Sequence, residues 1–140
     1  MPRIEFYVLP SSTDEGRLRA ACQLAAKAWR QGLGVFLRSE HDDQCAELDE
    51  LLWRFKAESF VPHARLIDDD TAPVLIGSDT PPAGFGSGLL INLNTRLPMD
   101  VDRYSRIIEI VNQSPALLAA CRENFRQYRQ RGYDPQRVEL

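Results

Sequence analysis

IEFYVL, residues 4–9, opens the part of the chain that decides the fold. Its β-branched and aromatic residues are typical of a buried strand, and the PSST that follows supplies residues that favour turns and helix caps. Residues 14–31 then show the periodicity of an amphipathic helix, with Thr13 as the expected N-cap and Gly32 as the expected end. The chain therefore begins with a strand and a helix.

The same alternation continues along the chain. GVFLR, residues 34–38, predicts a second strand, and a second helix is expected from residues 39–42 through about Phe55. A strand, helix, strand, helix order favours an α/β domain with a mainly parallel sheet. The rest of the chain adds a polar connection (63–72), two strands (73–78 and 89–94), a helix (101–112) and a last helix that starts at Ser114-Pro115 and runs to about Arg131.

The composition is that of one globular domain. The chain has 140 residues, of which 44% are hydrophobic and 26% are charged, and this excludes wholesale disorder. The three cysteines, Cys22, Cys45 and Cys121, form no C-x-x-C pair, so we expect reduced thiols and no zinc site. We find neither a signal-peptide pattern nor an apolar run of about 20 residues. We therefore expect a cytoplasmic protein without membrane contact.

The charge is unevenly distributed. A net charge of −3 disfavours a general nucleic-acid surface, yet residues 116–131 contain four arginines and one glutamate, a local charge of +3. Arg122, Arg126 and Arg129 recur beside an apolar stripe of the last helix that contains Cys121 and Phe125. Two interpretations stay open: a solvated basic face, or a guanidinium ridge suited to an acidic peptide or its terminal carboxylate.

Other motifs give little support for catalysis or cofactor binding. GFGSG (84–88) follows two prolines and opens a strand, whereas a dinucleotide fingerprint opens a helix. DDD (68–70) lacks the ligand spacing of a calcium loop. His41 and His63 belong to no local signature with a nucleophile, and a histidine such as His63 most often makes local hydrogen bonds.

An aromatic pair stands out near the end of the second helix. Trp53 can be explained as core at helical spacing, but Phe60 lies in a polar-flanked loop just before Pro62 and His63. An aromatic residue in such a loop is a candidate interface anchor.

Several segments along the chain resemble one family. With FYVL, CQLAAKAWRQGLGVFL, LDELLW, ESFVPH, LLINL and YRQRGY, nearly all of the chain is similar to the chi subunit of bacterial DNA polymerase III holoenzyme. The resemblance implies a single Rossmann-like three-layer domain over residues 1–140, without a nucleotide site, a cofactor or catalysis of its own.

The resemblance also implies two protein partners. Chi proteins bind the psi subunit, which tethers them to the clamp-loader complex, and in some members an XPD-like helicase is thought to use the same surface. In this sequence that surface corresponds to Trp53, Phe60, Pro62 and His63.

The second partner implied is the acidic C-terminal tail of single-stranded-DNA-binding protein, so that contact with DNA is indirect. The corresponding residues here are Val111, Arg122, Phe125 and Arg126. A basic family position is Leu118 in this sequence, which predicts weaker tail binding unless Arg129 substitutes.

Two other function classes compete with an adaptor. A small α/β enzyme or nucleotide binder would present convergent polar groups at the strand ends. A direct binder of single-stranded nucleic acid would use the C-terminal arginines. The acidic total charge and the lack of interleaved aromatic platforms count against this class.

Overall fold

A computed structural model describes residues 1–54 and 61–140. The helices are α1 (Asp14–Arg30), α2 (Asp42–Arg54) and α3 (Pro115–Gln130), with short 3-10 turns η1 (Ala83–Phe85) and η2 (Val101–Arg103). The strands are β1 (Arg3–Val8), β2 (Val35–Arg38), β3 (His63–Arg65), β4 (Val74–Gly77), β5 (Leu89–Asn92), β6 (Arg106–Val111) and β7 (Gln136–Glu139).

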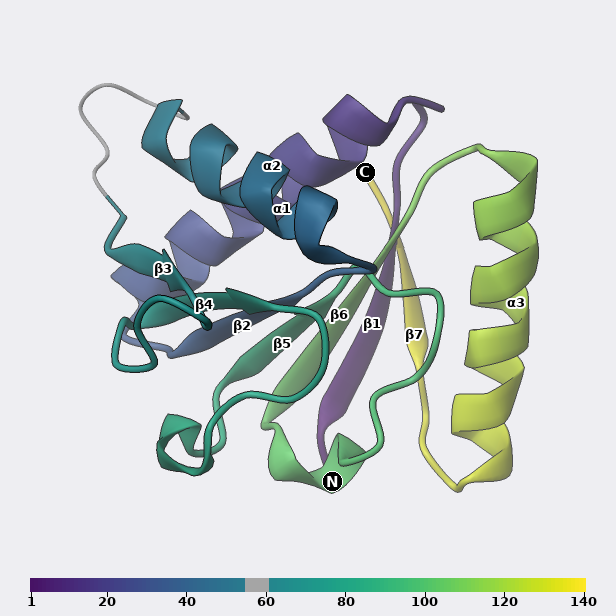
Figure 1. The fold of residues 1–140 in the computed structure, drawn as a ribbon. Coiled ribbons are helices and arrows are strands. Elements are labelled where there is room, and N and C mark those ends of the chain that lie inside the picture. The colour runs from purple at the N-terminus through teal and green to yellow at the C-terminus, as the bar shows by residue number, and fades with distance from the viewer. Residues whose placement is uncertain (55–60) are drawn as a thin grey trace.

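The fold is a three-layer α/β sandwich. In the described part of the chain, seven strands form one sheet in the order β3-β4-β2-β5-β6-β1-β7, and every neighbouring pair is parallel. Helices α1 and α2 pack on one face, whereas α3 covers the other face near β1, β6 and β7 (Figure 1). The predicted α/β class with a mainly parallel sheet is therefore confirmed.

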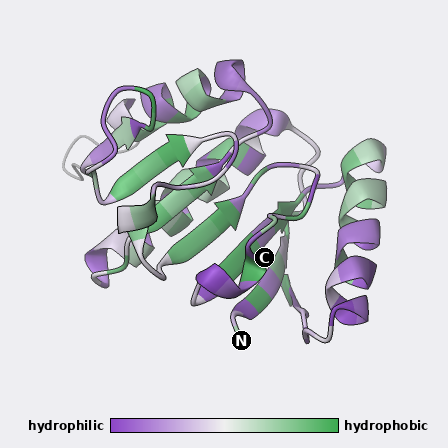
Figure 2. Ribbon diagram, turned by 60° about the horizontal axis from the view of Figure 1, so that its bottom comes forward, coloured by the Kyte–Doolittle hydropathy of each residue, from purple (hydrophilic) through white to green (hydrophobic). Residues whose placement is uncertain are grey.

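The centre of the sheet is buried on both faces. Every residue of β2, β4 and β5 is buried, as expected for strands with helices or loops on each side, and these strands are mainly hydrophobic in Figure 2. Side chains that point toward α1 and α2 form one apolar cluster, and those that point toward α3 form a second. The hydrophobic core is thus divided into two layers by the sheet.

The predicted helix over residues 101–112 is wrong. The chain forms only the short turn η2 and then the strand β6, which lies between β5 and β1. Ile107 and Val111 face the α3 layer, while Ile108 and Ile110 face the α1 layer. The run RIIEIV also fits helical spacing, but its β-branched residues pack better on a pleated surface that is buried on both sides.

Two edge strands were also absent from the sequence prediction. The segment taken as a polar connection begins with β3, which pairs with β4, and the C-terminal segment forms β7, which pairs with β1. Both strands are short, and their sequences HAR and QRVE show little apolar alternation. Edge strands of this kind are formed by pairing with a neighbour rather than by their own hydrophobic pattern.

The predicted helix ends agree well with the structure. The Thr13 side chain accepts a hydrogen bond from the Gly16 N–H, and Ser114 precedes Pro115 at the first turn of α3. Gly32 and Gly132 follow α1 and α3 with φ of 85° and 91°, a conformation that glycine adopts without strain.

Candidate functional site

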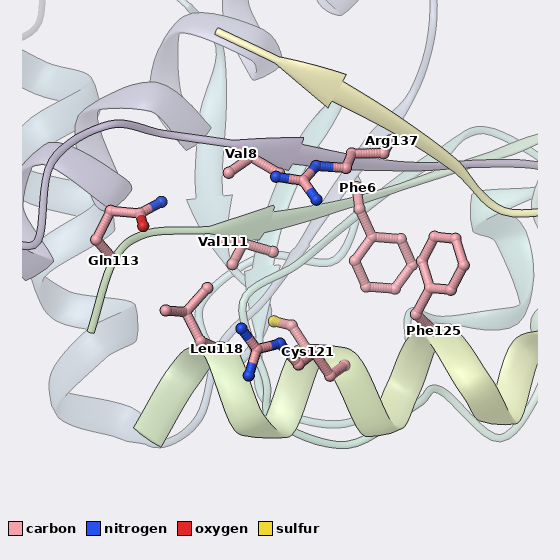
Figure 3. A pocket seen from close by; sticks show the side chains of 9 residues that line it. Phe6, Val8, Val111, Gln113, Leu118, Cys121, Phe125 and Arg137 are labelled. Atoms are coloured by element: carbon pink, nitrogen blue, oxygen red, sulfur yellow. The ribbon is translucent and has the colours of Figure 1, made fainter. Parts of the chain in front are cut away.

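An apolar pocket lies between α3 and the sheet. It has a volume of about 360 Å³, at the lower end of the roughly 300–1,000 Å³ of typical ligand pockets. Figure 3 shows side chains from the sheet and from α3 converging on it. The lining residues are Phe6, Val8, Val111, Gln113, Leu118, Cys121, Arg122, Phe125 and Arg137.

The floor of the pocket is set by strand register. Val8 on β1 pairs with Val111 on β6, so both side chains point to the α3 side, as does Phe6 two residues earlier. The Phe6 ring packs against the Phe125 ring with centroids 5.1 Å apart, which joins the floor to α3. A parallel α/β sheet commonly binds ligands near the carboxyl ends of its strands, where Val8 and Val111 lie.

The wall of the pocket comes from one face of α3. Cys121 is buried, while Leu118 and Phe125 are half-buried and pack on the sheet, as the periodicity predicted. Burial raises the pKa of the Cys121 thiol to about 12, so this side chain acts as a neutral apolar group at physiological pH. The pocket therefore offers an apolar interior with charged groups only at its rim.

The predicted tail-binding residues do not all reach the pocket. Val111, Arg122 and Phe125 line it. Arg126 instead pairs with Glu123 one turn earlier, with Nε 3.0 Å from Oε2. The Arg129 guanidinium carbon lies 4.9 Å from the centroid of the Phe125 ring, so Arg129 covers the outer side of that ring.

Arg137 is a pocket residue that the sequence prediction missed. It lies on β7, whose strand character the hydrophobic pattern does not reveal, and it pairs in register with Phe6. A basic residue a few positions after the end of the last helix was the available signal, but nothing in the sequence indicates that the chain returns to β1.

The second predicted surface lies on the other side of the sheet, near the end of α2. Trp53 has 59% of its surface exposed, so its interpretation as core is wrong. Its ring lies 4.7 Å from that of His63, in an edge-to-face arrangement. Pro62 is half-buried directly before β3, whereas Phe60 lies outside the described residues.

His63 makes hydrogen bonds to nearby backbone groups, as expected for a histidine that belongs to no catalytic signature. The side chain is only 1% exposed, with Nδ1 2.7 Å from the Val61 carbonyl oxygen and Nε2 3.2 Å from that of Asp49. An Asp49 side-chain oxygen lies 3.3 Å from the same Nε2. The His63 ring thus packs against the Trp53 ring, and its contact with Asp49 joins α2 to β3.

The carboxyl edge of the sheet is closed by internal hydrogen bonds where a nucleotide would bind in related folds. Arg17 donates to the carbonyl oxygens of Ile110 and Leu93, at 2.8 and 3.1 Å. Beside it, Arg38 donates to Asn92, and Asn92 donates to the buried carboxylate of Glu109 at 2.8 Å. No nucleotide site is evident in the described part of the chain.

The glycine-rich loop has a packing role. A Cβ at Gly88 would lie 2.3 Å from the Gly34 carbonyl oxygen, so the two backbone segments approach more closely than a side chain permits. Phe85 in the same loop packs on Phe36 and Tyr104. Gly88 therefore permits the close contact between β2 and the start of β5, in keeping with its position just before that strand.

No group of three His, Cys, Asp or Glu side chains is arranged to hold a metal ion in the described ranges. Likewise, no helix described here has the length and apolar character needed to cross a membrane.

The fold and pocket define a parallel α/β protein with an apolar, arginine-rimmed cavity on its α3 face. Residues 1–136 match the family model described as DNA polymerase III chi subunit, HolC, and the chain belongs to that family. The chain is thus of the kind that forms a subunit of DNA polymerase III in DNA replication.

Three curated relatives agree with this assignment, each named DNA polymerase III subunit chi. The relative from Pseudomonas aeruginosa is 46% identical over 133 residues, which cover 95% of this chain and 93% of the relative. The relative from Escherichia coli is 31% identical over 96% of this chain and 95% of its own length. The relative from Haemophilus influenzae is 32% identical, with coverages of 93% and 92%.

Proposed function

We propose that this chain is a non-catalytic adaptor of the replisome. One surface binds the acidic C-terminal tail of single-stranded-DNA-binding protein, and the other binds psi or an equivalent partner of the clamp-loader complex. The observation that carries the proposal is the apolar pocket on the α3 face with Arg122 at its rim. Such a pocket fits a peptide that ends in an apolar residue and carries acidic residues before it.

The charge around the pocket supports this choice of ligand. Arg122, Arg126 and Arg129 all lie on α3, so an acidic peptide that enters the pocket passes guanidinium groups along the helix. Within the described part of the chain, the Arg122 side chain forms no hydrogen bond or ion pair, so its donors are available to a carboxylate. Arg126 and Arg129 act at longer range, because one pairs with Glu123 and the other stacks on Phe125.

The test is a titration of a fluorescent tail peptide against the wild type, Arg122→Glu and Arg126→Glu. We expect both variants to weaken binding, since each adds repulsion toward the peptide, and Arg122→Glu to have the larger effect because Arg122 lines the pocket. Higher salt should weaken binding to the wild type by screening exposed charges.

Arg19→Glu on α1 is the matched control, because it makes the same change in net charge on the opposite face of the sheet. Equal affinity of the wild type and Arg122→Glu would contradict the proposal. Binding of a single-stranded oligonucleotide in place of the peptide would favour the direct nucleic-acid binder.

The other surface is proposed for psi or, in its place, an XPD-like helicase. Trp53 supports this assignment, because a tryptophan that is more than half exposed on a helix end is a common interface anchor. The His63 ring packs against the Trp53 ring, His63 also lies within hydrogen-bond distance of the Asp49 carbonyl oxygen on α2, and Pro62 directly precedes His63. Phe60 belongs to the same proposal, although it lies outside the described residues.

A further inference from the structure

The rim of the pocket carries a second guanidinium group, from β7. Arg137 pairs in register with Phe6, and Glu139 pairs with Val8, so both side chains point to the same face as the pocket floor. Figure 3 shows the Arg137 side chain extended along β1 near Val8, while Leu118 and Phe125 rise from α3. The pocket is therefore lined by arginines from two elements, Arg122 on α3 and Arg137 on β7.

Arg137 is held by an acidic neighbour that a ligand can replace. Its Nε and Nη2 atoms each lie 2.6 Å from Oε1 of Glu139. The two side chains are 67% and 65% exposed, and ion pairs between exposed side chains contribute little to stability. A carboxylate that enters the pocket would meet the same guanidinium fork, and charge-assisted hydrogen bonds of this kind are among the stronger ones.

The other arginines on this face are less suited to the same role. Arg126 is engaged by Glu123 on the outside of α3, and Arg129 covers the outer side of Phe125. Neither lines the pocket. Leu118 adds an apolar side chain at one end of the wall, and Arg122 and Arg137 are the charged residues among those that line the pocket.

We propose that Arg137 and Arg122 together bind the terminal carboxylate of an acidic peptide whose last apolar side chain fills the pocket, and that Glu139 competes with this carboxylate for Arg137. The inference rests on the proposed function, since the occupant is the same acidic tail. It adds a residue from β7 to the site and a competing acid that sets the affinity. The two side chains then have opposite effects: Arg137 favours binding and Glu139 opposes it.

The experiment compares a free-acid tail peptide with its C-terminal amide on the wild type, Arg137→Gln and Glu139→Gln. Loss of a charged hydrogen bond predicts about tenfold weaker binding of the free acid to Arg137→Gln. Glu139→Gln should bind the free acid several-fold more tightly. Arg137→Gln should bind the amide almost as the wild type does, because the amide has already lost the charge that Arg137 recognises.

Arg19→Gln and Glu15→Gln provide the matched controls. This exposed arginine and glutamate form a comparable pair on α1, so the two variants change the net charge equally at a distance from the pocket. Both should bind the free acid as the wild type does. Thermal melts should show that all four variants remain folded, because the substituted side chains are exposed.

The outcomes separate this inference from the proposed function. If the wild type binds the free acid but Arg137→Gln binds it equally well, the role of Arg137 is overturned and the adaptor function stands. Unchanged affinity of Glu139→Gln would overturn the competition. If the wild type binds no tail peptide at all, both proposals fail.

Discussion

At the scale of single residues, the most unusual group is a carboxyl in the core. Glu109 lies on β6, and its Oε2 accepts hydrogen bonds from the Asn92 side chain and the Tyr128 hydroxyl, each at 2.8 Å. Burial raises the pKa of Glu109 to about 7, although these hydrogen bonds and nearby guanidinium groups act in the opposite direction. Tyr128 is on α3, so this carboxyl helps to hold the helix that forms the pocket wall.

The raised pKa predicts a pH-dependent stability. Between its ordinary value of 4.5 and about 7, Glu109 binds a proton more tightly in the folded state than in the unfolded chain. Its contribution is therefore fully present below pH 4.5 and is lost as the pH rises to about 7. At about 1.4 kcal/mol per pKa unit, the loss is on the order of 3 kcal/mol.

Glu109→Gln should remove this part of the pH dependence, because the amide oxygen accepts the same hydrogen bonds without titrating. Urea unfolding of both proteins at about pH 5 and about pH 8 measures the difference. The same change in unfolding free energy in both proteins would show that Glu109 keeps an ordinary pKa.

At the scale of elements, the glycine-rich segment 84–88 allows close backbone contact at the start of β5. The Gly34 carbonyl oxygen accepts a hydrogen bond from the Leu89 N–H at 2.9 Å, and Gly88 packs directly against that carbonyl. Hydrogen bonding and close packing at this point align β5 with β2.

Gly88→Ala should therefore destabilise the fold by about 1–3 kcal/mol or more, because the new Cβ would overlap backbone that cannot move without breaking the β2–β5 pairing. Gly84→Ala is the control from the same loop, since a Cβ there meets nothing within 4 Å. Denaturant midpoints measure both effects. Equal stability of the two variants would contradict the packing role of Gly88.

At the scale of the whole molecule, the sheet separates the two proposed binding surfaces. Trp53 lies on α2, and the arginine-rimmed pocket lies beneath α3 on the opposite face (Figure 1). Residues that are far apart and share no partners usually contribute independently. We expect an adaptor with this geometry to bind both partners at once, without competition between them.

This separation predicts independent effects of substitution. Trp53→Ala should weaken binding to a psi-containing clamp loader by at least about tenfold, because loss of an aromatic anchor costs about 2 kcal/mol or more. The tail peptide should bind this variant as it binds the wild type. Arg122→Glu should show the reverse pattern, and surface plasmon resonance with both partners measures the two affinities.

Met99→Ala is the control for loss of an exposed apolar side chain, because Met99 is 90% exposed in the loop before η2. Equal clamp-loader binding by the wild type and Trp53→Ala would remove Trp53 from the interface. Displacement of the clamp loader by the tail peptide would contradict an adaptor with two separate sites.

The amino-acid sequence by itself determined the elements whose signals are local. The cap at Thr13, the alternation of strands and helices, and the apolar stripe of α3 with its arginines follow from spacing over a few residues. The family resemblance also came from the sequence, through motifs spread over nearly all of the chain.

Tertiary structure alone decided the features that depend on neighbours far away in the chain. RIIEIV became β6 because a place between β5 and β1 buries both of its faces, and QRVE became β7 because it pairs with β1. That pairing brings Arg137 beside Phe6, more than 130 positions earlier, and completes the rim of the pocket. Strand pairing joins residues by register rather than by sequence distance, so no local pattern reveals which side chains will share a site.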